Sequence, residues 1–175
     1  MLTMVARTIT DIDESLIRDS QQGDRNAFAR LLDMIYDLIY CFALKWLDQA
    51  SDAEDVTQLV CVKLAKVIHQ FRFESAFSTW LYRIVVNCVR DWQRSQKSHL
   101  HEDIAVAESQ ISPHVSETEA ELQRVLSQVS DMGKGYKETL LLVYAEGLTH
   151  AEAAQVLEIK ESTVSWRLHH IRKRL

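Results

Sequence analysis

The sequence GLTHAEAAQVLEIKESTVSWRLHHIRKRL, residues 147–175, decides the fold of the C-terminal part of this chain. Gly147 can end a preceding helix at Glu146, because glycine readily adopts the left-handed backbone that closes a helix C-terminus. Thr149 and Glu152 have the spacing of a capping box, in which each side chain accepts a hydrogen bond from the other residue's backbone N–H. The pattern therefore predicts that a short helix begins at Thr149.

Residues 158–161 are predicted to form a tight turn, after which Ser162 or Thr163 can cap a final helix. The inward face of this helix carries Val164, Leu168 and Ile171, and its outward face carries Ser165, Trp166, Arg167, His169, His170 and Arg172. Two short helices joined by a tight turn, the second basic on its outer face, are typical of a helix-turn-helix that reads the DNA major groove. The alternative is a solvated terminal helix, since Lys and Arg in a last turn also favour the helix dipole.

The composition of the whole chain favours helices. Hydrophobic residues make up 47% of the sequence, and its 175 residues include only one proline and four glycines. Such a chain forms long uninterrupted helices more readily than a turn-rich β architecture. No apolar run reaches the roughly 18 residues of a membrane span, and the N-terminus lacks the features of a signal peptide. We therefore expect an all-α protein without membrane insertion, located in the cytoplasm.

Charge is unevenly distributed along the sequence, whose net charge is −5. Residues 98–131 contain one Lys or Arg against seven Asp or Glu, whereas residues 162–175 contain four Lys or Arg and no acidic residue. The local charge of a surface determines what it contacts, so an acidic total does not exclude binding to DNA.

Helical periodicity is lost over residues 97–116, which are acidic and contain the only proline, Pro113. This loss predicts a flexible linker between two small helical domains. The predicted bounds are 1–97 for an N-terminal bundle, 98–117 for the linker and 118–175 for the helix-turn-helix domain.

The N-terminal bundle is predicted to contain four helices. A short helix ends at Gln22-Gly23, and a long amphipathic helix begins at Asp24. Ser51 and Glu54 have the spacing of a second capping box, which predicts a helix that runs from there to about Gln70. After the polar and aromatic segment FRFESAF, residues 71–77, a fourth helix is expected from about residue 78 to residue 96.

The fourth helix has a cationic stripe. Arg83, Asn87, Arg90, Arg94 and Lys97 are spaced four, three, four and three residues apart, which places them on one face of the helix. Apolar residues that include Leu81, Val85 and Val89 occupy the other side. One face of this helix is therefore expected to bind an anionic partner and the other to pack in the core.

No metal or cofactor site is predicted. Adjacent histidines such as His169 and His170 point apart on a helix, and no Glu-x-x-His pair of a carboxylate metal bundle occurs. The three cysteines, Cys41, Cys61 and Cys88, match no CxxC spacing and are interpreted as core residues. We accordingly expect a DNA-binding protein rather than an enzyme.

Several motifs in their order along the chain resemble the extracytoplasmic-function (ECF) group of bacterial sigma factors, which belong to the sigma-70 family. These motifs are Asp52-Ala-Glu-Asp55, Gln58, Phe71-Arg72, the run from Ser75 to Ile84, Asn87, Gly147-Leu-Thr, Glu152-Ala-Ala, Ser162-Thr-Val164 and Arg167. The resemblance covers about residues 13–97 and 118–175. It implies a subunit that binds core RNA polymerase, directs it to specific promoters and promotes opening of the DNA.

The resemblance assigns Asp52, Glu54, Asp55 and Gln58 to the helix that docks on the clamp helices of the largest polymerase subunit. Carboxylates clustered at an exposed helix N-terminus also suit a basic partner electrostatically. Their alternative role is helix capping and stabilisation of the helix dipole, and both roles are compatible.

The resemblance also implies two promoter contacts. The minus-ten element is assigned to Phe71, Arg72, Phe73, Glu74, Ser75, Trp80, Arg83, Asn87, Arg90 and Arg94. Aromatic rings and cations suit single-stranded DNA, because bases stack on rings and phosphates need countercharge. Phe77 and Trp80 are also expected to be buried as support for the loop. The minus-thirty-five element is assigned to Ser162, Thr163, Ser165, Trp166, Arg167, His169, His170, Arg172 and Lys173.

Three departures from the family pattern affect specificity. Phe73-Glu74 replaces the small residues usual after Phe-Arg, Ser165 and Trp166 stand where Arg and Ser are usual, and residues 132–136 lack the usual Leu-Pro. An unusual minus-thirty-five sequence is expected.

An anti-sigma factor is a further partner that the family implies. The rival interpretation is a helix-turn-helix regulator with a sensory or dimerising N-terminal domain. Such a domain would not need the acidic helix, aromatic loop and cationic stripe that follow one another between residues 51 and 94.

Overall fold

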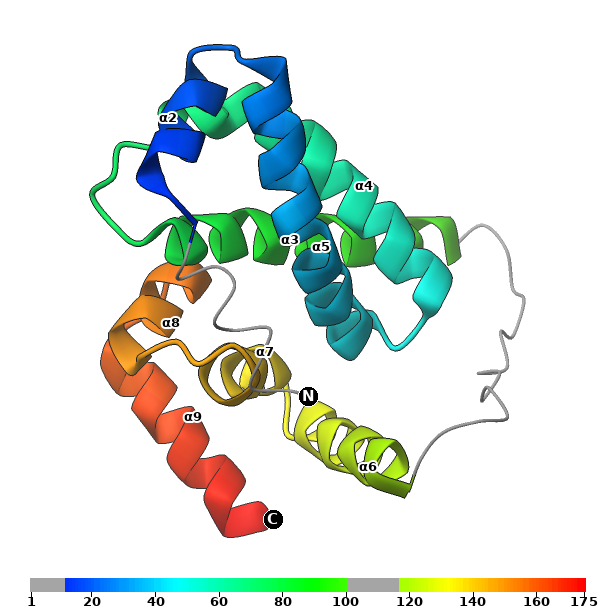
Figure 1. Cartoon of the computed structure of the whole chain (residues 1–175). Helices are drawn as coiled ribbons and strands as arrows, with labels where there is room; N and C mark the ends of the chain where they lie inside the picture. The colour runs from blue at the N-terminus through cyan, green and yellow to red at the C-terminus, as the bar shows by residue number, and fades with distance from the viewer. Residues whose placement is uncertain (1–11, 101–116) are drawn as a thin grey trace.

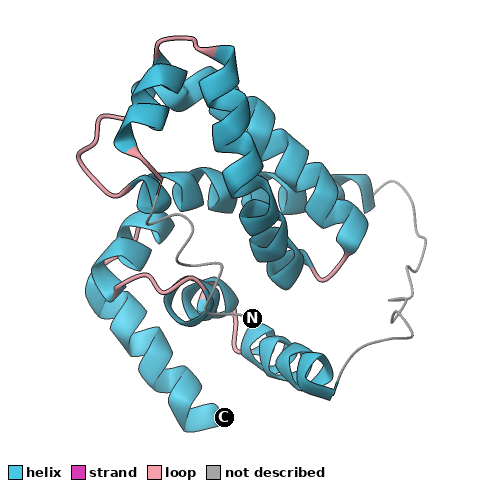
Figure 2. Ribbon diagram, in the orientation of Figure 1, coloured by secondary structure: helices cyan, strands magenta, loops and turns pink. Residues whose placement is uncertain are grey.

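Helices make up all the regular structure in residues 12–100 and 117–175, the residues that this computed structural model describes. Figure 2 shows these helices joined by short loops, with no strand in the described part of the chain. The all-α fold predicted from composition and periodicity is therefore confirmed. Most of the predicted linker lies outside the described residues.

The N-terminal module consists of α2 (Glu14–Gln21), α3 (Arg25–Leu47), α4 (Ala50–Val67), the short 3₁₀ helix η1 (Ile68–Gln70) and α5 (Phe77–Leu100). Asp24 begins α3 as predicted, since its carboxylate accepts hydrogen bonds from the backbone N–H groups of Asn26 and Ala27 at 2.8 and 3.1 Å. The helix α5 continues three residues into the segment predicted as linker. The module packs around fully buried side chains that include Leu31, Phe42 and Leu81.

The capping box predicted at Ser51 and Glu54 is wrong. The helix α4 begins at Ala50 with Gln49 as its N-cap residue, and no side chain caps it. Because the helix starts one residue before Ser51, that serine lies in the first turn, where it cannot cap the helix. Glu54 is thereby left exposed on the helix surface.

The C-terminal module consists of α6 (Glu117–Asp131), α7 (Tyr136–Leu140), the π-helical turn η2 (Leu141–Ala145), α8 (His150–Leu157) and α9 (Glu161–Arg174). The capping box of Thr149 and Glu152 is confirmed, with both of its hydrogen bonds present. Gly147 follows the end of η2 with a φ of +70°, as its predicted role requires.

The cap predicted at Ser162 or Thr163 is wrong, because α9 begins at Glu161 with Lys160 as its N-cap and without a side-chain cap. The helix start that the sequence left open near residues 132–136 lies at Tyr136, preceded by Gly135 with a φ of +90°. The three inward residues predicted for α9, Val164, Leu168 and Ile171, are all buried.

The two modules pack against each other. Figure 1 shows α5 between the other N-terminal helices and the C-terminal helices, with α8 beside its N-terminal half. Buried side chains from both modules form one hydrophobic core cluster. One long face of α5 is therefore turned toward the C-terminal module.

Of the three cysteines, Cys88 is buried as predicted, and Cys41 and Cys61 are half-buried. Burial raises the pKa of the Cys61 and Cys88 thiols, which makes them poor nucleophiles at neutral pH. No cluster of His, Cys, Asp and Glu in the described ranges could hold a metal ion. Nor does any helix there combine the length and hydropathy needed to cross a bilayer.

Candidate nucleic-acid interface

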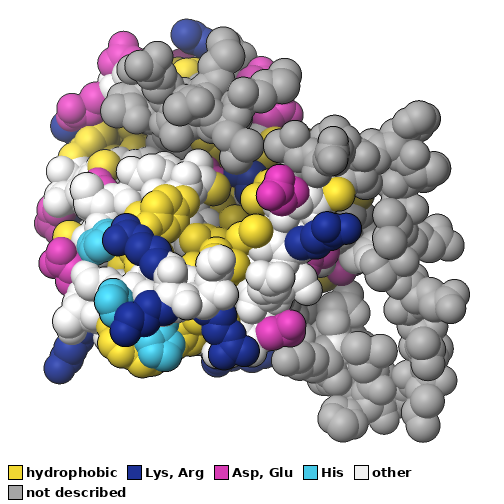
Figure 3. All heavy atoms as spheres, turned by 90° about the horizontal axis from the view of Figure 1, so that it is seen from below, with side chains coloured by type: hydrophobic (Ala, Val, Ile, Leu, Met, Phe, Trp, Pro, Cys, Tyr) yellow, Lys and Arg dark blue, Asp and Glu magenta, His cyan; other side chains and the backbone are white. Residues whose placement is uncertain are grey.

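The outer face of α9 is open to solvent. Seven of the nine residues assigned to it are exposed, namely Ser162, Ser165, Trp166, His169, His170, Arg172 and Lys173. Figure 3, which views the molecule from below, shows Lys, Arg and His side chains gathered together on one part of this surface. The surface therefore offers cations and hydrogen-bond donors to a polyanion.

An aromatic strip interrupts the basic surface of α9. The rings of Trp166 and His170 are stacked with their centroids 4.7 Å apart, and Tyr136 of α7 lies 6.0 Å from the Trp166 ring. Trp166 nevertheless keeps 52% of its surface exposed. Such a strip can contact the thymine methyl group, which lies at the edge of the major groove.

Two residues outside α9 support its outer face, and sequence reasoning did not include them. The Tyr144 hydroxyl accepts hydrogen bonds from the Arg172 guanidinium at 2.9 and 2.6 Å. His150 Nδ1 lies 2.9 Å from Ser165 Oγ. Both partners are brought to α9 by tertiary packing, so no local sequence signal indicates them.

Arg167 does not point freely outward, which corrects the prediction for this residue. Its guanidinium is half-buried and donates hydrogen bonds to the Gly135 carbonyl at 3.1 Å and to Thr139 Oγ1 at 3.3 Å. A Cβ atom on Gly135 would lie 2.4 Å from the guanidinium Nη1. Arg167 thus holds the start of α7 in this arrangement, and Gly135 leaves it the space to do so.

The cationic stripe of α5 is largely turned toward the C-terminal module. Arg83 donates a hydrogen bond from Nε to the Glu158 carboxylate at 3.0 Å, across the boundary between the modules. Asn87, Arg90 and Arg94 line a cleft of about 1020 Å³, to which the C-terminal module contributes Lys134, Lys137 and Arg167. Asn87 and Arg90 are half-buried there, and the Arg90 Nε is buried without a hydrogen-bond partner among the described residues.

The loop before α5 is built on a cluster of rings. Phe71 packs against Phe73, Phe77 and Trp80, with ring centroids 4.7, 5.4 and 5.2 Å away. Phe71 is only 5% exposed, so its ring supports the loop instead of forming a base-binding surface, contrary to its assignment. Phe77 is buried as predicted, and Trp80 is half-buried.

Polar residues form the outer surface of this loop, where Arg72, Glu74 and Ser75 are exposed. Phe73 has a left-handed backbone with a φ of +59°, which is rare for an aromatic residue. The Arg18 guanidinium lies 4.0 Å from the centroid of the Phe73 ring. The loop is therefore fixed from both sides, by the aromatic cluster and by α2.

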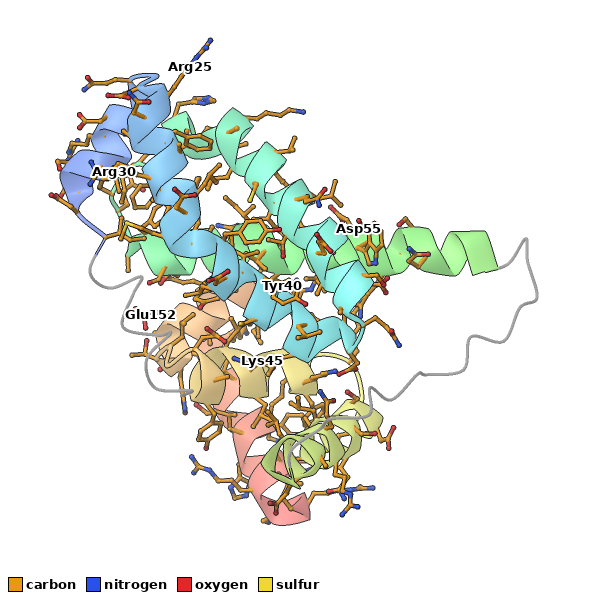
Figure 4. The ribbon with its side chains drawn as sticks, turned by 45° about the vertical axis from the view of Figure 1, so that its right-hand side comes forward. Arg25, Arg30, Tyr40, Lys45, Asp55 and Glu152 are labelled. Atoms are coloured by element: carbon orange, nitrogen blue, oxygen red, sulfur yellow. The ribbon has the colours of Figure 1, made fainter. Side chains whose placement is uncertain are left out.

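The helix α4 presents a second exposed surface, which includes Glu54, Asp55 and Gln58, with Asp52 half-buried beside them. Figure 4 shows Asp55 on a side of α4 that faces away from the C-terminal module. Leu59 and Val62 continue this surface and are 48% and 55% exposed. Sequence reasoning missed these two residues, although their spacing from Asp55 places all three on one helical face.

Known protein families match both modules. Sigma-70 region 2 matches residues 31–99, and Sigma-70 region 4 matches residues 122–175. The chain is 28% identical over 172 residues to "ECF RNA polymerase sigma factor SigW" of Bacillus subtilis, covering 91% of this chain and 92% of that protein. It is 27% identical over 174 residues to "ECF RNA polymerase sigma-E factor" of Haemophilus influenzae, covering 92% of each.

Solved structures share the fold. CnrH in complex with the cytosolic domain of CnrY aligns with a TM-score of 0.69 at 22% identity, over 94% of each chain. The sigma factor RpoE of Bartonella quintana, in complex with the anti-sigma factor NepR, aligns with a TM-score of 0.71 at 20% identity. That alignment covers 84% of this chain and 92% of RpoE.

Two helical modules that match different regions of one family, the second of them a helix-turn-helix, define a transcription initiation factor. The comparisons do not favour a regulator with a sensory N-terminal domain. The chain belongs to the sigma-70 family and is a sigma factor of its ECF group.

Proposed function

We propose that the chain docks on core RNA polymerase through the exposed surface of α4. Carboxylates at Asp52, Glu54 and Asp55 suit a basic partner, and the neighbouring side chains of Leu59 and Val62 supply apolar area that a stable interface needs. The single observation that carries this proposal is the exposure of two large apolar residues beside the acidic cluster. The docking surface also includes Gln58.

The minus-ten element of the promoter is proposed to bind at the loop before α5 and along the stripe of α5. The displaced strand would contact the loop at Arg72, Phe73, Glu74 and Ser75. The rings of Phe71 and Trp80 support this loop from within the protein. Arg83, Asn87, Arg90 and Arg94 would continue the contact along α5. Asn87 is the residue of this set suited to hydrogen-bond a base edge, while the arginines suit phosphates.

The minus-thirty-five element is proposed to bind the outer face of α9 in the major groove. Trp166, His169 and His170 would set the sequence preference, because they reach outward at the centre of the exposed face. Arg172 and Lys173 suit phosphate contacts. Arg167 and Thr163, which are half-buried, would contribute mainly by positioning the helix.

The proposed role also implies a cellular location and a further partner. The cytoplasm is the proposed location, because the polymerase and the chromosome are there. No catalytic activity and no cofactor are proposed. Because both solved neighbours are complexes, one of them with the anti-sigma factor NepR, an anti-sigma factor is a proposed partner of this chain as well.

Transcription in vitro with purified core polymerase and a genomic promoter library tests the function. We expect transcripts whose promoters share two upstream elements, one read by each module. Core polymerase that initiates at the same sites with and without the chain would contradict the proposal.

Asp55→Arg tests the docking surface separately. Charge reversal at the centre of the acidic cluster is expected to weaken binding to core polymerase at least about tenfold, while DNA binding by the chain stays unchanged. The matched control is Asp37→Arg, which reverses an exposed acidic residue on α3. Equal affinity of both variants for polymerase in a pull-down titration would count against the α4 surface.

A further inference from the structure

The outward hydroxyl of Ser165 is paired with a histidine of the neighbouring helix. His150 is the first residue of α8, and its Nδ1 lies 2.9 Å from Ser165 Oγ. Ser165 is exposed on the outer face of α9, next to Trp166. Within the described ranges, this contact is the one hydrogen bond that the Ser165 side chain makes. The direction of that bond therefore decides what Ser165 can offer to a partner outside the protein.

The start of α8 holds His150 in position. The Glu152 carboxylate accepts hydrogen bonds from Thr149 N and Oγ1 at 2.8 and 2.7 Å, and the Glu152 N–H donates to Thr149 Oγ1 at 3.2 Å. His150 lies between the two residues of this capping box and is half-buried. Ala153, one turn further on, is fully buried, and α8 packs directly on α9. The packing of two helices thus sets the imidazole against Ser165.

A serine hydroxyl alone discriminates poorly between bases, because it can both donate and accept a hydrogen bond. The contact with His150 removes one of these two roles. When Nδ1 accepts, the Ser165 proton points toward the histidine, and only oxygen lone pairs face outward. When Nδ1 carries a proton, it donates to the Ser165 oxygen, and the hydroxyl proton of Ser165 is free to point outward.

The two protonation states of His150 give these two arrangements. A neutral imidazole has one donor nitrogen and one acceptor nitrogen, which are assigned from their surroundings. Nε2 of His150 has no hydrogen-bond partner among the residues that the structure describes, so the proton is assigned to Nε2 and Nδ1 accepts from Ser165. An imidazolium donates from both nitrogens. Histidine exchanges between these forms in the range between pH 5 and 8.

Other charged or titratable groups lie on the elements packed around this contact. They include Glu152 and Glu158 of α8, Arg83 of α5, Tyr144 and Glu146 at η2, and Glu161 and His169 of α9. All of them except Glu161 and His169 have hydrogen-bond partners of their own. Glu161 and His169 are exposed, one helical turn before and after Ser165. Their charges affect the pH at which His150 exchanges its proton, but not the direction of the exchange.

We infer that His150 is a positioning residue that sets the base preference of Ser165. With a neutral His150, Ser165 is an acceptor and selects an amino base, adenine or cytosine; with a protonated His150, it is a donor and selects a keto base, guanine or thymine. These pairs differ at one place in the major groove, where adenine and cytosine present an amino group and guanine and thymine a carbonyl oxygen. The inference rests on the proposed minus-thirty-five surface and makes its sequence preference dependent on pH.

Selection of bound sequences from random duplex DNA tests the inference, with holoenzyme assembled from the full chain and purified core polymerase. At pH 8 we expect amino bases to be enriched about fivefold over keto bases at one base pair, the effect of one hydrogen bond. At pH 6 the order should reverse at the same base pair. Ser165→Ala identifies that base pair, because it should abolish the preference there at both pH values.

His150→Asp separates His150 from the other histidines of the surface. A carboxylate accepts but does not donate, so Ser165 must point its proton inward, and the preference for amino bases should persist at both pH values. His169 and His170 remain in this variant, so an inversion that they cause would also remain. The matched control is Ala151→Asp, which adds the same charge at the next, exposed residue. It should keep the inversion of the wild type.

Two results would overturn the inference. One is a wild-type preference that is the same at pH 6 and pH 8, and the other is an inversion that persists in His150→Asp. If Ser165→Ala or Trp166→Ala still changes the selected sequence, the minus-thirty-five surface is correct and only the role of His150 is wrong. If neither variant changes the selected sequence, the proposed surface itself is wrong.

Discussion

The two helices assigned to promoter DNA, α5 and α9, carry similar cationic faces but differ in what lies on them. The helix α9 packs on α7 and α8 along one side only, so its outer face is open. The helix α5 packs on α3 and α4 and also on α8, so its cationic stripe faces another part of the protein. Amphipathicity therefore identifies a face suited to DNA, but it does not tell whether that face is free.

The largest expected effect contrasts the two sides of α9. Leu168 is fully buried on the inner side, and Leu168→Ala should lower the free energy of unfolding by about 2–5 kcal/mol through lost burial and a cavity. His169→Ala, on the outer side of the same helix, should change it by less than about 0.5 kcal/mol. Urea unfolding followed by circular dichroism measures both, and similar values would mean that the outer face is also part of the core.

The next effect concerns the contact that covers α5. Tyr82→Phe removes the α5 hydroxyl that donates a hydrogen bond to Glu146 of the C-terminal module. The buried carboxylate then lacks one donor, at a cost of about 1–3 kcal/mol to the packing of the two modules. A larger radius of gyration than that of the wild type is expected. Tyr40→Phe, on a half-buried tyrosine of α3, is the control and should have no such effect. An unchanged radius in both variants would show that the hydroxyl is dispensable.

A smaller effect separates the roles of the two DNA faces. Asn87→Ala should slow formation of the open complex at a cognate promoter roughly fivefold, the equivalent of about 1 kcal/mol for one lost hydrogen bond, with little effect on duplex binding. Trp166→Ala should weaken duplex binding at the minus-thirty-five element instead. Permanganate footprinting and a gel-shift titration distinguish these steps. Equal losses in both steps for both variants would remove the distinction between the faces.

The smallest expected effect is a pH dependence that comes from titration of Tyr82 and is absent at neutral pH. Burial, together with the charge of Glu146 and its hydrogen bond, raises the pKa of Tyr82 well above its ordinary value of 10.0. The packed modules therefore retain a Tyr82 proton that separated modules would lose above about pH 10, even though the Lys45 ammonium is also close to Glu146. The packing of the modules should be independent of this group at lower pH and weaken as pH rises beyond 10. A radius that stays constant from pH 8 to pH 11 would contradict this expectation.

Local sequence signals predicted most of the fold. Helical periodicity placed the long helices, and both Asp24 and the Thr149 capping box begin their helices as expected. The caps at Ser51 and Ser162 failed because each helix begins two residues earlier than a cap at that serine would require, which moves the side chain from the cap into the first turn. Pattern alone does not resolve such a shift.

The candidate site was only partly predictable, because its state depends on contacts between distant residues. Tyr82 and Glu146 are 64 positions apart, and Lys45 and Glu146 are 101 apart. One signal for Glu146 was nevertheless present in the sequence. A carboxylate at the C-terminal end of a helix opposes the helix dipole, so such a residue needs a partner from elsewhere. Leu59 and Val62 also indicated a contact with another molecule, because they are large apolar residues that lie outside the buried face of α4.

The contact between α2 and the loop before α5 makes the shape of that loop a property of a distant segment. Gln21 donates hydrogen bonds from its side-chain amide to the carbonyls of Ile68 and Phe71 at 2.9 and 2.7 Å, and Arg18 covers the ring of Phe73. Packing against α2 therefore helps to set the shape of the loop. If the loop binds the minus-ten element as proposed, sequence changes in α2, which carries none of the assigned DNA contacts, would alter promoter choice through the loop. Promoter specificity could then change without any substitution in the contact residues themselves.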